Sequence, residues 1–190
     1  MFRKDRIKSK YRKDIKAKIN ELAQLTYTEE DFEGLDFFIK SYSKESFNQI
    51  NFEWNGKHAS EFNDVNMKFR ERLSYYILTK YDDLDNSELL LDLFTEQSKF
   101  DKEAWGSSVY LFFIGERLLN ASGSKYVLEF LESAMRSFDT YECCVSIRIK
   151  KKKVKLLAEE IKNLRLISEG DVKASKLLDN GLEYIANFSR

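Results

Sequence analysis

The chain has 190 residues, of which 43% are hydrophobic and 14% aromatic, and its 32 basic and 32 acidic side chains cancel. This composition excludes a disordered chain, and the length suits one domain with a core of its own. The zero net charge excludes a strongly basic nucleic-acid-binding protein and a polyacidic one. One histidine and two cysteines leave few groups for catalysis or metal binding.

No segment is apolar enough to cross a membrane, because the longest apolar run, 109–114, has six residues and a span needs about 20. The stretch from Arg3 to Lys18 is charged and lacks the apolar region of a secretory signal. Cys143 and Cys144 are neighbours, which does not suit a disulfide framework. We therefore expect a cytoplasmic protein with two reduced thiols.

Helical periodicity dominates the chain, with apolar residues recurring every three or four positions. The first predicted helix carries this stripe: Ile7, Tyr11, Ile15, Ile19 and Leu22. Thr28 and Asp31 form a capping pair that predicts a second helix from about residue 29, and Ser60 predicts the cap of a third. In the second helix Phe37 is followed directly by Phe38, so one helical face cannot bury both rings equally.

Further helices are predicted to begin near residues 87, 102, 124, 142 and 171. Asn86 or Ser87 would cap a short leucine-rich helix that ends at Phe94, and Asp101 would precede the following one.

Two stretches fit more than one structure. Within 141–149 the odd positions are all apolar, which is the alternation of a strand, but the same residues extended toward Val154 also form one long helix. We favour the helix, because no convincing second strand lies nearby to pair with this one. Residues 43–56 are ambiguous between helix and strand in the same way.

The predicted fold is all-α: a single domain over residues 1–190, built as an irregular helical bundle or antiparallel helical array of seven to eight helices. The basic helix at 1–25 packs on this domain or extends from it. The helix starts are unevenly spaced, so no repeat of fixed length is predicted. The absence of proline suits uninterrupted helices.

Catalytic and metal chemistry have few candidate groups. His58 is the only imidazole, so a histidine-based triad would need it, but a surface or helix-entry histidine is the simpler interpretation. The segment from Asp83 begins like a calcium-binding EF-hand loop, yet its sixth and twelfth positions are Glu88 and Phe94 instead of glycine and glutamate. We therefore predict no enzyme, no metal ion and no organic cofactor.

The zero net charge hides four charged blocks. Residues 1–20 carry nine basic and two acidic side chains, and residues 148–165 carry eight and two. Residues 21–55 and 81–104 each carry two basic and eight acidic side chains. Either the blocks neutralise one another across packed helices, where a surface ion pair contributes about 0–1 kcal/mol, or they steer a charged partner.

The basic blocks, 1–20 and 148–165, define an alternative function, in which the chain is a nucleic-acid-binding or regulatory protein. The candidate phosphate-binding residues are Arg148, Lys150, Lys151, Lys152, Lys153 and Lys155. The same lysine run also suits the solvated face of a long helix.

The acidic segment 27–54 is the more unusual one, because it mixes carboxylates with eight aromatic residues. Aromatic anchors beside carboxylates suit a basic protein partner. The candidate partner-binding residues are Glu29, Glu30, Asp31, Glu33, Asp36 and Trp54. Our leading hypothesis is a non-enzymatic inhibitor of a basic protein, of the bacterial immunity or antitoxin type. The sequence leaves a homo-oligomer open.

Overall fold

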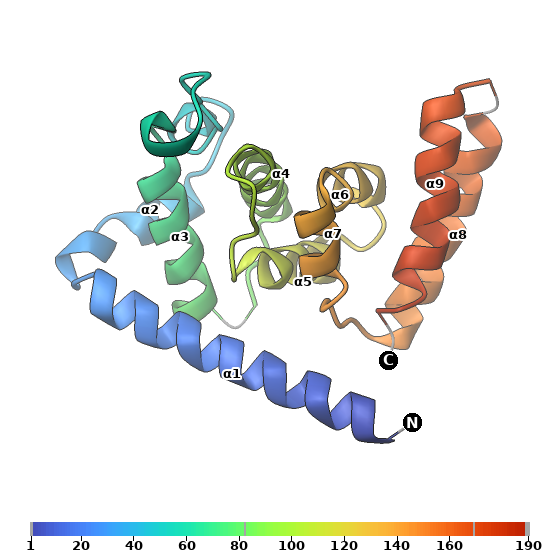
Figure 1. Cartoon of the computed structure of the whole chain (residues 1–190), viewed down its shortest axis with the longest axis horizontal. Helices are drawn as coiled ribbons and strands as arrows, with labels where there is room; N and C mark the ends of the chain where they lie inside the picture. The colour runs from blue at the N-terminus through green and yellow to red at the C-terminus, as the bar shows by residue number, and fades with distance from the viewer. Residues whose placement is uncertain (1, 82, 169, 189–190) are drawn as a thin grey trace.

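The computed structural model describes residues 2–81, 83–168 and 170–188, and for residues 2–11 it describes the backbone alone (Figure 1). This part of the chain contains helices and turns and no β-strand; Trp54 and Asp64 form one isolated bridge. The predicted all-α class is confirmed. None of the described helices combines the length and apolar character needed to cross a bilayer.

The described residues form nine α-helices and three short 3-10 helices. The α-helices are α1 (Phe2–Thr26), α2 (Leu35–Lys40), α3 (Met67–Lys80), α4 (Ser87–Glu103), α5 (Leu111–Ser122), α6 (Val127–Ala134), α7 (Phe138–Cys144), α8 (Lys151–Ile167) and α9 (Val172–Ile185). The 3-10 helices are η1 (Glu30–Phe32), η2 (Phe47–Gln49) and η3 (Ala59–Glu61).

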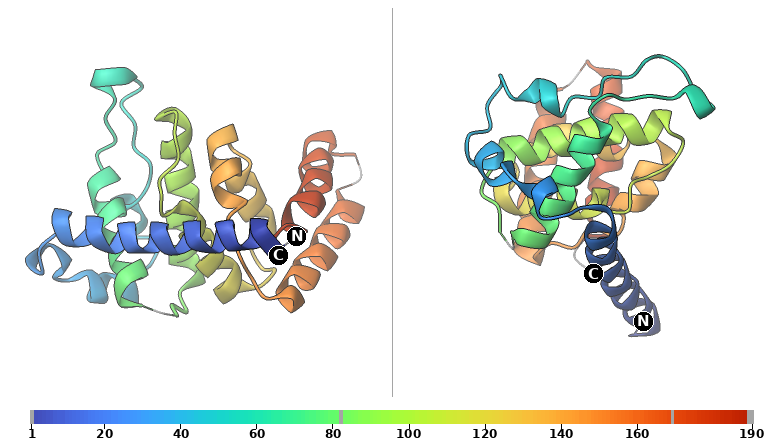
Figure 2. Two further views of the ribbon diagram at one scale, coloured as in Figure 1. Left: turned by 60° about the horizontal axis from the view of Figure 1, so that its bottom comes forward. Right: turned by 90° about the vertical axis from the view of Figure 1, so that its left-hand side faces the viewer.

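The helices follow one another across the molecule, from α2 and α3 at one end to the α8–α9 hairpin at the other (Figure 1). α4 lies in the middle and packs against α3, α5, α6 and α7, while α6 contacts both helices of the terminal hairpin. The long α1 crosses the side of this row (Figure 2, left). It packs on α3, with Ile19 and Ala23 buried and Ile15 and Leu22 half-buried, whereas the predicted stripe residues Ile7 and Tyr11 lie outside the described side chains.

The core depends on close contact between α4, α5 and α6. The rings of Phe94 and Phe130 stack with centroids 5.1 Å apart, and Phe188 from the end of the chain meets Phe130 edge-on at 6.0 Å. Gly115 allows α5 to pack closely on α4, because a Cβ atom at this position would lie only 2.8 Å from the Phe94 ring. These contacts join the middle of the molecule to its C-terminal hairpin.

Asn86 is confirmed as a helix cap: its side-chain oxygen accepts a hydrogen bond from the backbone N–H of Leu89 (3.1 Å). The helix that follows does not end at Phe94, however, but continues to Glu103. Asp101 therefore lies in its last turn instead of preceding a new helix. This carboxylate is buried and accepts a hydrogen bond from the backbone N–H of Ser108 (2.9 Å), so it shapes the turn between α4 and α5.

The second and third helices begin later than predicted. Thr28 and Asp31 do form a reciprocal cap, but it opens only the short η1, and α2 restarts at Leu35. Ser60 lies in η3, and α3 starts seven residues further on, at Met67. The segment 43–56 is neither a full helix nor a strand, because it contains the single turn η2 and the isolated bridge.

The prediction of one long helix through 141–164 is wrong, and this is why nine α-helices occur instead of seven or eight in the described residues. α7 ends at Cys144, and the chain stays irregular until Lys151. In this connection Ile147 and Ile149 are both buried, which accounts for the end of the alternating pattern. The backbone N–H of Arg148 donates to Glu116 (2.7 Å) and that of Ile149 to the Phe188 carbonyl (3.4 Å), so neither bond belongs to a strand or a helix.

Candidate protein-binding site

The acidic segment is shaped by a capping box and a glycine turn. The N–H of Thr28 donates to Asp31 Oδ2 (2.8 Å), and the N–H of Asp31 donates to the Thr28 hydroxyl (3.3 Å). The bond from the Thr28 backbone lowers the pKa of the Asp31 carboxyl, helped by a second bond from the Thr28 hydroxyl. Gly34 then takes a φ of 78°, which glycine adopts without strain, and turns the chain directly into α2.

Four of the five predicted carboxylates come together around one open hollow of about 530 Å³ beside α3. We call this surface the acidic hollow; its lining is Glu29, Glu30, Phe32, Glu33, Gly34, Asp36, Tyr76 and Lys80. Asp31 is not part of the lining, because its carboxylate is bound to Thr28 and lies 3.9 Å from the Arg72 guanidinium. Four of the five carboxylates predicted to bind a partner therefore share one surface, and Asp31 does not.

The charges of the acidic hollow are only partly balanced. The Lys80 ammonium lies 3.9 Å from Glu29, and the Tyr81 hydroxyl donates to Asp36 (2.6 Å). That hydrogen bond lowers the pKa of Asp36 and raises the pKa of Tyr81 to about 12. Glu30 and Glu33 are exposed, and no hydrogen bond or ion pair engages their carboxylates within the described part of the chain. The hollow is thus open to an incoming cation.

Aromatic rings form the apolar part of this surface. Phe32 and Tyr76 lie 5.1 Å apart in the lining of the hollow. In α2, Phe38 packs edge-on against Phe69 (5.1 Å), whereas Phe37 is 76% exposed beside Asp36. As expected, the helix does not bury these two neighbouring rings equally. An exposed ring next to free carboxylates is an arrangement that protein partners use.

Trp54, the predicted aromatic anchor, lies elsewhere. It is half-buried, its indole N–H donates to the Lys57 carbonyl (2.7 Å), and its backbone bridges Asp64 just before α3 begins. The acidic hollow involves Tyr76 and Lys80, in the last turns of the same helix. The structure therefore places Trp54 near the start of α3 and the carboxylates near its end.

The candidate phosphate-binding residues divide into two groups. Arg148 folds back on its own loop and donates to the carbonyls of Val145 and Ile147, and Lys153 donates to the Asn120 carbonyl. The other four are exposed around the start of α8: Lys150, Lys151, Lys152 and Lys155. No acidic residue lies in the first turn of α8, and no described side chain caps it, so the positive end of the helix dipole adds to these charges.

The two basic blocks meet at one point, where α1 crosses the connection between α7 and α8. The Arg12 guanidinium donates to the Ser146 carbonyl (2.6 Å) and pairs with Glu116 (2.9 Å), which also holds Arg148. A hollow of about 530 Å³ lies here between α1 and α5, and its walls mix Arg12 and Lys16 with Asp83, Asp85 and Glu116. Because its wall carries both basic and acidic side chains, this hollow favours neither anionic nor cationic ligands.

His58 is exposed at the entry to η3, and the rings of Trp54 and Trp105 lie 4.9 and 5.9 Å from its own. Cys143 and Cys144 are free thiols. The described residues contain no group of three or more histidine, cysteine, aspartate or glutamate side chains that could hold a metal ion.

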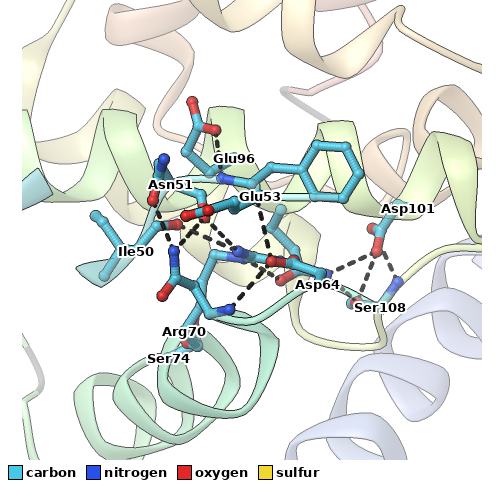
Figure 3. A network of polar contacts seen from close by, with 12 residues as sticks. Ile50, Asn51, Glu53, Asp64, Arg70, Ser74, Glu96, Asp101 and Ser108 are labelled. Carbon is cyan, nitrogen blue, oxygen red and sulfur yellow. Dashed lines mark hydrogen bonds and ion pairs between the residues drawn. The ribbon is translucent and has the colours of Figure 1, made fainter. Parts of the chain in front are cut away.

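A buried polar network at the start of α3 is the main feature that sequence reasoning missed (Figure 3). Arg70, which is 0% exposed, pairs with Asp64 (2.5 Å) and donates to Gln97 (3.0 Å). Gln97 donates in turn to Asp101 (2.8 Å), and burial raises the pKa of the Asp101 carboxyl. Glu96 accepts a hydrogen bond from the backbone N–H of Phe52 (2.8 Å). The network joins the 50–66 segment to α3, α4 and the α4–α5 turn.

One signal in the sequence could have revealed this network. Arg70 lies three residues before Leu73 and seven before Ile77, so it shares the inward face of α3 with two fully buried side chains. A charged residue on such a stripe requires a buried partner.

No protein-family model, curated protein or solved structure matches this chain.

Proposed function

We propose that the protein is a non-enzymatic, cytoplasmic inhibitor that binds a basic protein at the acidic hollow, in the manner of a bacterial immunity or antitoxin protein. The observation that carries the proposal is the convergence of four carboxylates from the η1–α2 region on one open hollow that contains a single lysine in the described part of the chain. A surface with this excess of negative charge attracts basic partners and repels acidic ones.

The chemistry of the hollow suits a lysine or arginine side chain. Glu30 and Glu33 have carboxylates without an internal partner, so they can bind a cation without breaking a bond within the chain. Phe32 and Tyr76 offer ring surface to the aliphatic stem of the incoming side chain. Exposed carboxylates at the rim of an interface mainly change the rate of association. The Phe37 ring, once a partner covers it, would mainly slow dissociation.

The test is charge reversal of the two unpaired carboxylates in a Glu30→Lys/Glu33→Lys variant. Capture from native lysate and mass spectrometry would first identify the basic partner. The product of the neighbouring coding sequence would be tested as a candidate partner as well. Association of the purified pair should then slow by about tenfold or more in the variant, and the difference should shrink as salt rises.

The matched control is Glu129→Lys/Glu132→Lys, which reverses two exposed carboxylates with the same spacing on α6. Equal binding by both variants, or a captured partner that is not basic, would contradict the proposal. Loss of inhibition of the partner's activity by the Glu30/Glu33 variant alone would support its inhibitory part.

Nucleic-acid binding is the second candidate, and the uncompensated lysines at the start of α8 favour it. Binding through them should weaken steeply with salt. Absence of binding to duplex and single-stranded polymers at about 50 mM salt, where phosphate contacts dominate binding, would exclude this function.

A further inference from the structure

A second hollow, of about 460 Å³, adjoins the acidic hollow at the end of α3. Its lining is Asn20, Ala23, Gln24, Tyr27, Glu29, Phe32, Thr79 and Lys80. Glu29, Phe32 and Lys80 line both hollows, so the two hollows meet at these residues. We call the second one the amide hollow, after the side chains of Asn20 and Gln24.

A row of aromatic rings connects the two hollows. α1 crosses the end of α3 before the chain turns toward α2, and η1 also packs on α3 (Figure 1). In this corner the Phe32 ring lies between Tyr27 and Tyr76, with centroids 5.7 and 5.1 Å away. Tyr27 lines the amide hollow and Tyr76 lines the acidic hollow. One ligand can therefore contact ring surface in both.

The two hollows differ in charge. They share the pair formed by Glu29 and Lys80, to which the acidic hollow adds the carboxylates of Glu30, Glu33 and Asp36. The amide hollow adds no charged side chain from the described part of the chain. A ligand that suits both hollows is therefore cationic at one end and uncharged at the other.

The uncharged wall can bind a polypeptide main chain. Asn20 and Gln24 are exposed one turn apart on α1, and no hydrogen bond engages either amide group within the described residues. A side-chain amide offers a donor and an acceptor, as a peptide group does. One helical turn rises about 5.4 Å and two residues of an extended chain span roughly 6.6 Å, so the two amides match alternate residues of an extended segment.

Lys80 limits the number of basic side chains that fit. Its ammonium lies 3.9 Å from Glu29, so the carboxylate at the junction of the hollows is already compensated. The carboxylates without an internal partner, Glu30 and Glu33, lie only in the acidic hollow. A second basic residue next to the first would meet the Lys80 charge, which disfavours polybasic segments.

We propose that the acidic and amide hollows together bind one extended segment of the basic partner, in which a single lysine or arginine is flanked by uncharged residues. The basic side chain enters the acidic hollow, the segment crosses the Phe32 ring, and Asn20 and Gln24 bind its main chain. This inference rests on the proposed function, because it takes the acidic hollow as the binding site. It adds the form of the partner's contact, a sparsely charged loop or terminus.

The test compares two probes by NMR titration. One is N-acetyl-arginine amide, and the other is a blocked peptide with a terminal arginine and about five serine or threonine residues, which spans about 20 Å when extended. The arginine amide should shift the signals of residues 29–36 alone, whereas the peptide should also shift the side-chain amide signals of Asn20 and Gln24. The peptide, with its arginine at one end or the other, should bind about tenfold more tightly.

Gln24→Ala should weaken binding of the peptide about fivefold and leave binding of the arginine amide unchanged. The matched control is Gln49→Ala, which truncates an exposed glutamine in η2 and should change neither. Circular dichroism verifies that the variants are folded. In wild type a second arginine beside the first should add no affinity, whereas in Lys80→Gln it should.

The outcomes separate this inference from the proposed function. If the arginine amide binds at residues 29–36 but the serine and threonine residues add no affinity, the extended segment is wrong and the acidic hollow remains the proposed site. The same conclusion follows if Gln24→Ala and Gln49→Ala behave alike, or if a second arginine strengthens binding to wild type. If neither probe binds, or if Glu30→Lys/Glu33→Lys binds both probes as wild type does, both proposals fail.

Discussion

Replacing Arg70 by methionine is the sharpest test of how the fold is held around α3. Arg70 is fully buried, and its guanidinium donates to Asp64, to Gln97 and to the Ile50 carbonyl (3.2 Å). Methionine fills much of the same volume but removes the charge and all of these donors. Asp64 would then be a buried carboxylate with bonds only from the backbone N–H groups of Glu53 and Asn66 in the described structure.

The expected loss is large compared with the stability of a domain. Breaking a buried ion pair by removing one partner destabilises a protein by about 3–5 kcal/mol, out of a total near 5–15 kcal/mol. For a chain of this length each kcal/mol lowers the melting temperature by roughly 2–4 °C, so Arg70→Met should lower it by about 6–20 °C.

Urea unfolding followed by far-UV circular dichroism measures the change in free energy, with Lys68→Met, an exposed position on the same helix, as control. A double-mutant cycle with Asp64→Asn isolates the interaction. Because each single change leaves the other charge unpaired, the double variant should be more stable than the two losses predict, by about 0.5–3 kcal/mol. A loss below about 1 kcal/mol in Arg70→Met, or strict additivity in the cycle, would refute this reasoning.

Four further substitutions test local features. Because the pKa of Asp31 is lowered in the folded chain, its carboxylate stabilises the fold at pH values above its ordinary pKa of 3.8. This contribution disappears as the pH falls through the folded pKa. Between pH 7 and pH 3 the melting temperature of Asp31→Asn should therefore fall less than that of the wild type. Asp171→Ala removes the cap of α9 and should lower the free energy of unfolding by about 1 kcal/mol. Asn86→Ala should lower it by about 1–3 kcal/mol, because the Asn86 amide caps α4 and also donates to the Ile39 carbonyl (3.0 Å). Equal losses in urea unfolding would contradict a stabilising role for the bond to Ile39. Lys151→Glu should raise the free energy of unfolding by about 0.3–1 kcal/mol at low salt, since a carboxylate interacts favourably with the positive end of the α8 dipole. The gain should vanish at about 1 M salt. A lower stability at low salt would show that Lys151 itself stabilises the fold.

The sequence predicted the helical class well because that signal is local. Apolar spacing and the Asn86 cap each depend on residues within one or two turns, and both appear in the structure. The errors lie where a distant group decides. Asp101 has the sequence character of a helix cap, but its partners, Gln97 and Ser108, place it inside a helix end. The connection after Cys144 is irregular because Glu116 and Phe188 take its N–H groups.

The same distinction applies to groups of residues on the surface. The acidic hollow draws its carboxylates from residues 29–36, so composition alone locates it. The rings of Trp54 and Trp105 both lie against His58, although Trp105 comes almost fifty residues later in the chain, and no local pattern connects them. The turn residues that follow Trp105, Gly106 to Ser108, were the available sign that this indole does not lie inside a helix.

The buried network also explains why the double variant in the Arg70 cycle should not recover full stability. Buried ion pairs can often be replaced by apolar side chains with little loss, because removing both charges removes the desolvation penalty of each. Here, however, the charged side chains bind main-chain groups of an irregular segment. Arg70 holds the Ile50 carbonyl, Asp64 the N–H of Glu53, and Glu96 the N–H of Phe52.

Those main-chain groups stay buried or half-buried whatever replaces the side chains, and an aliphatic core would leave them without partners. The network is therefore needed to let residues 50–66 leave helical geometry while remaining packed on α3 and α4. A regular helix there would satisfy its own backbone and need no buried arginine. It would also remove the turn that carries Trp54 and His58, so the polar core and the aromatic surface above it are consequences of the same irregular segment.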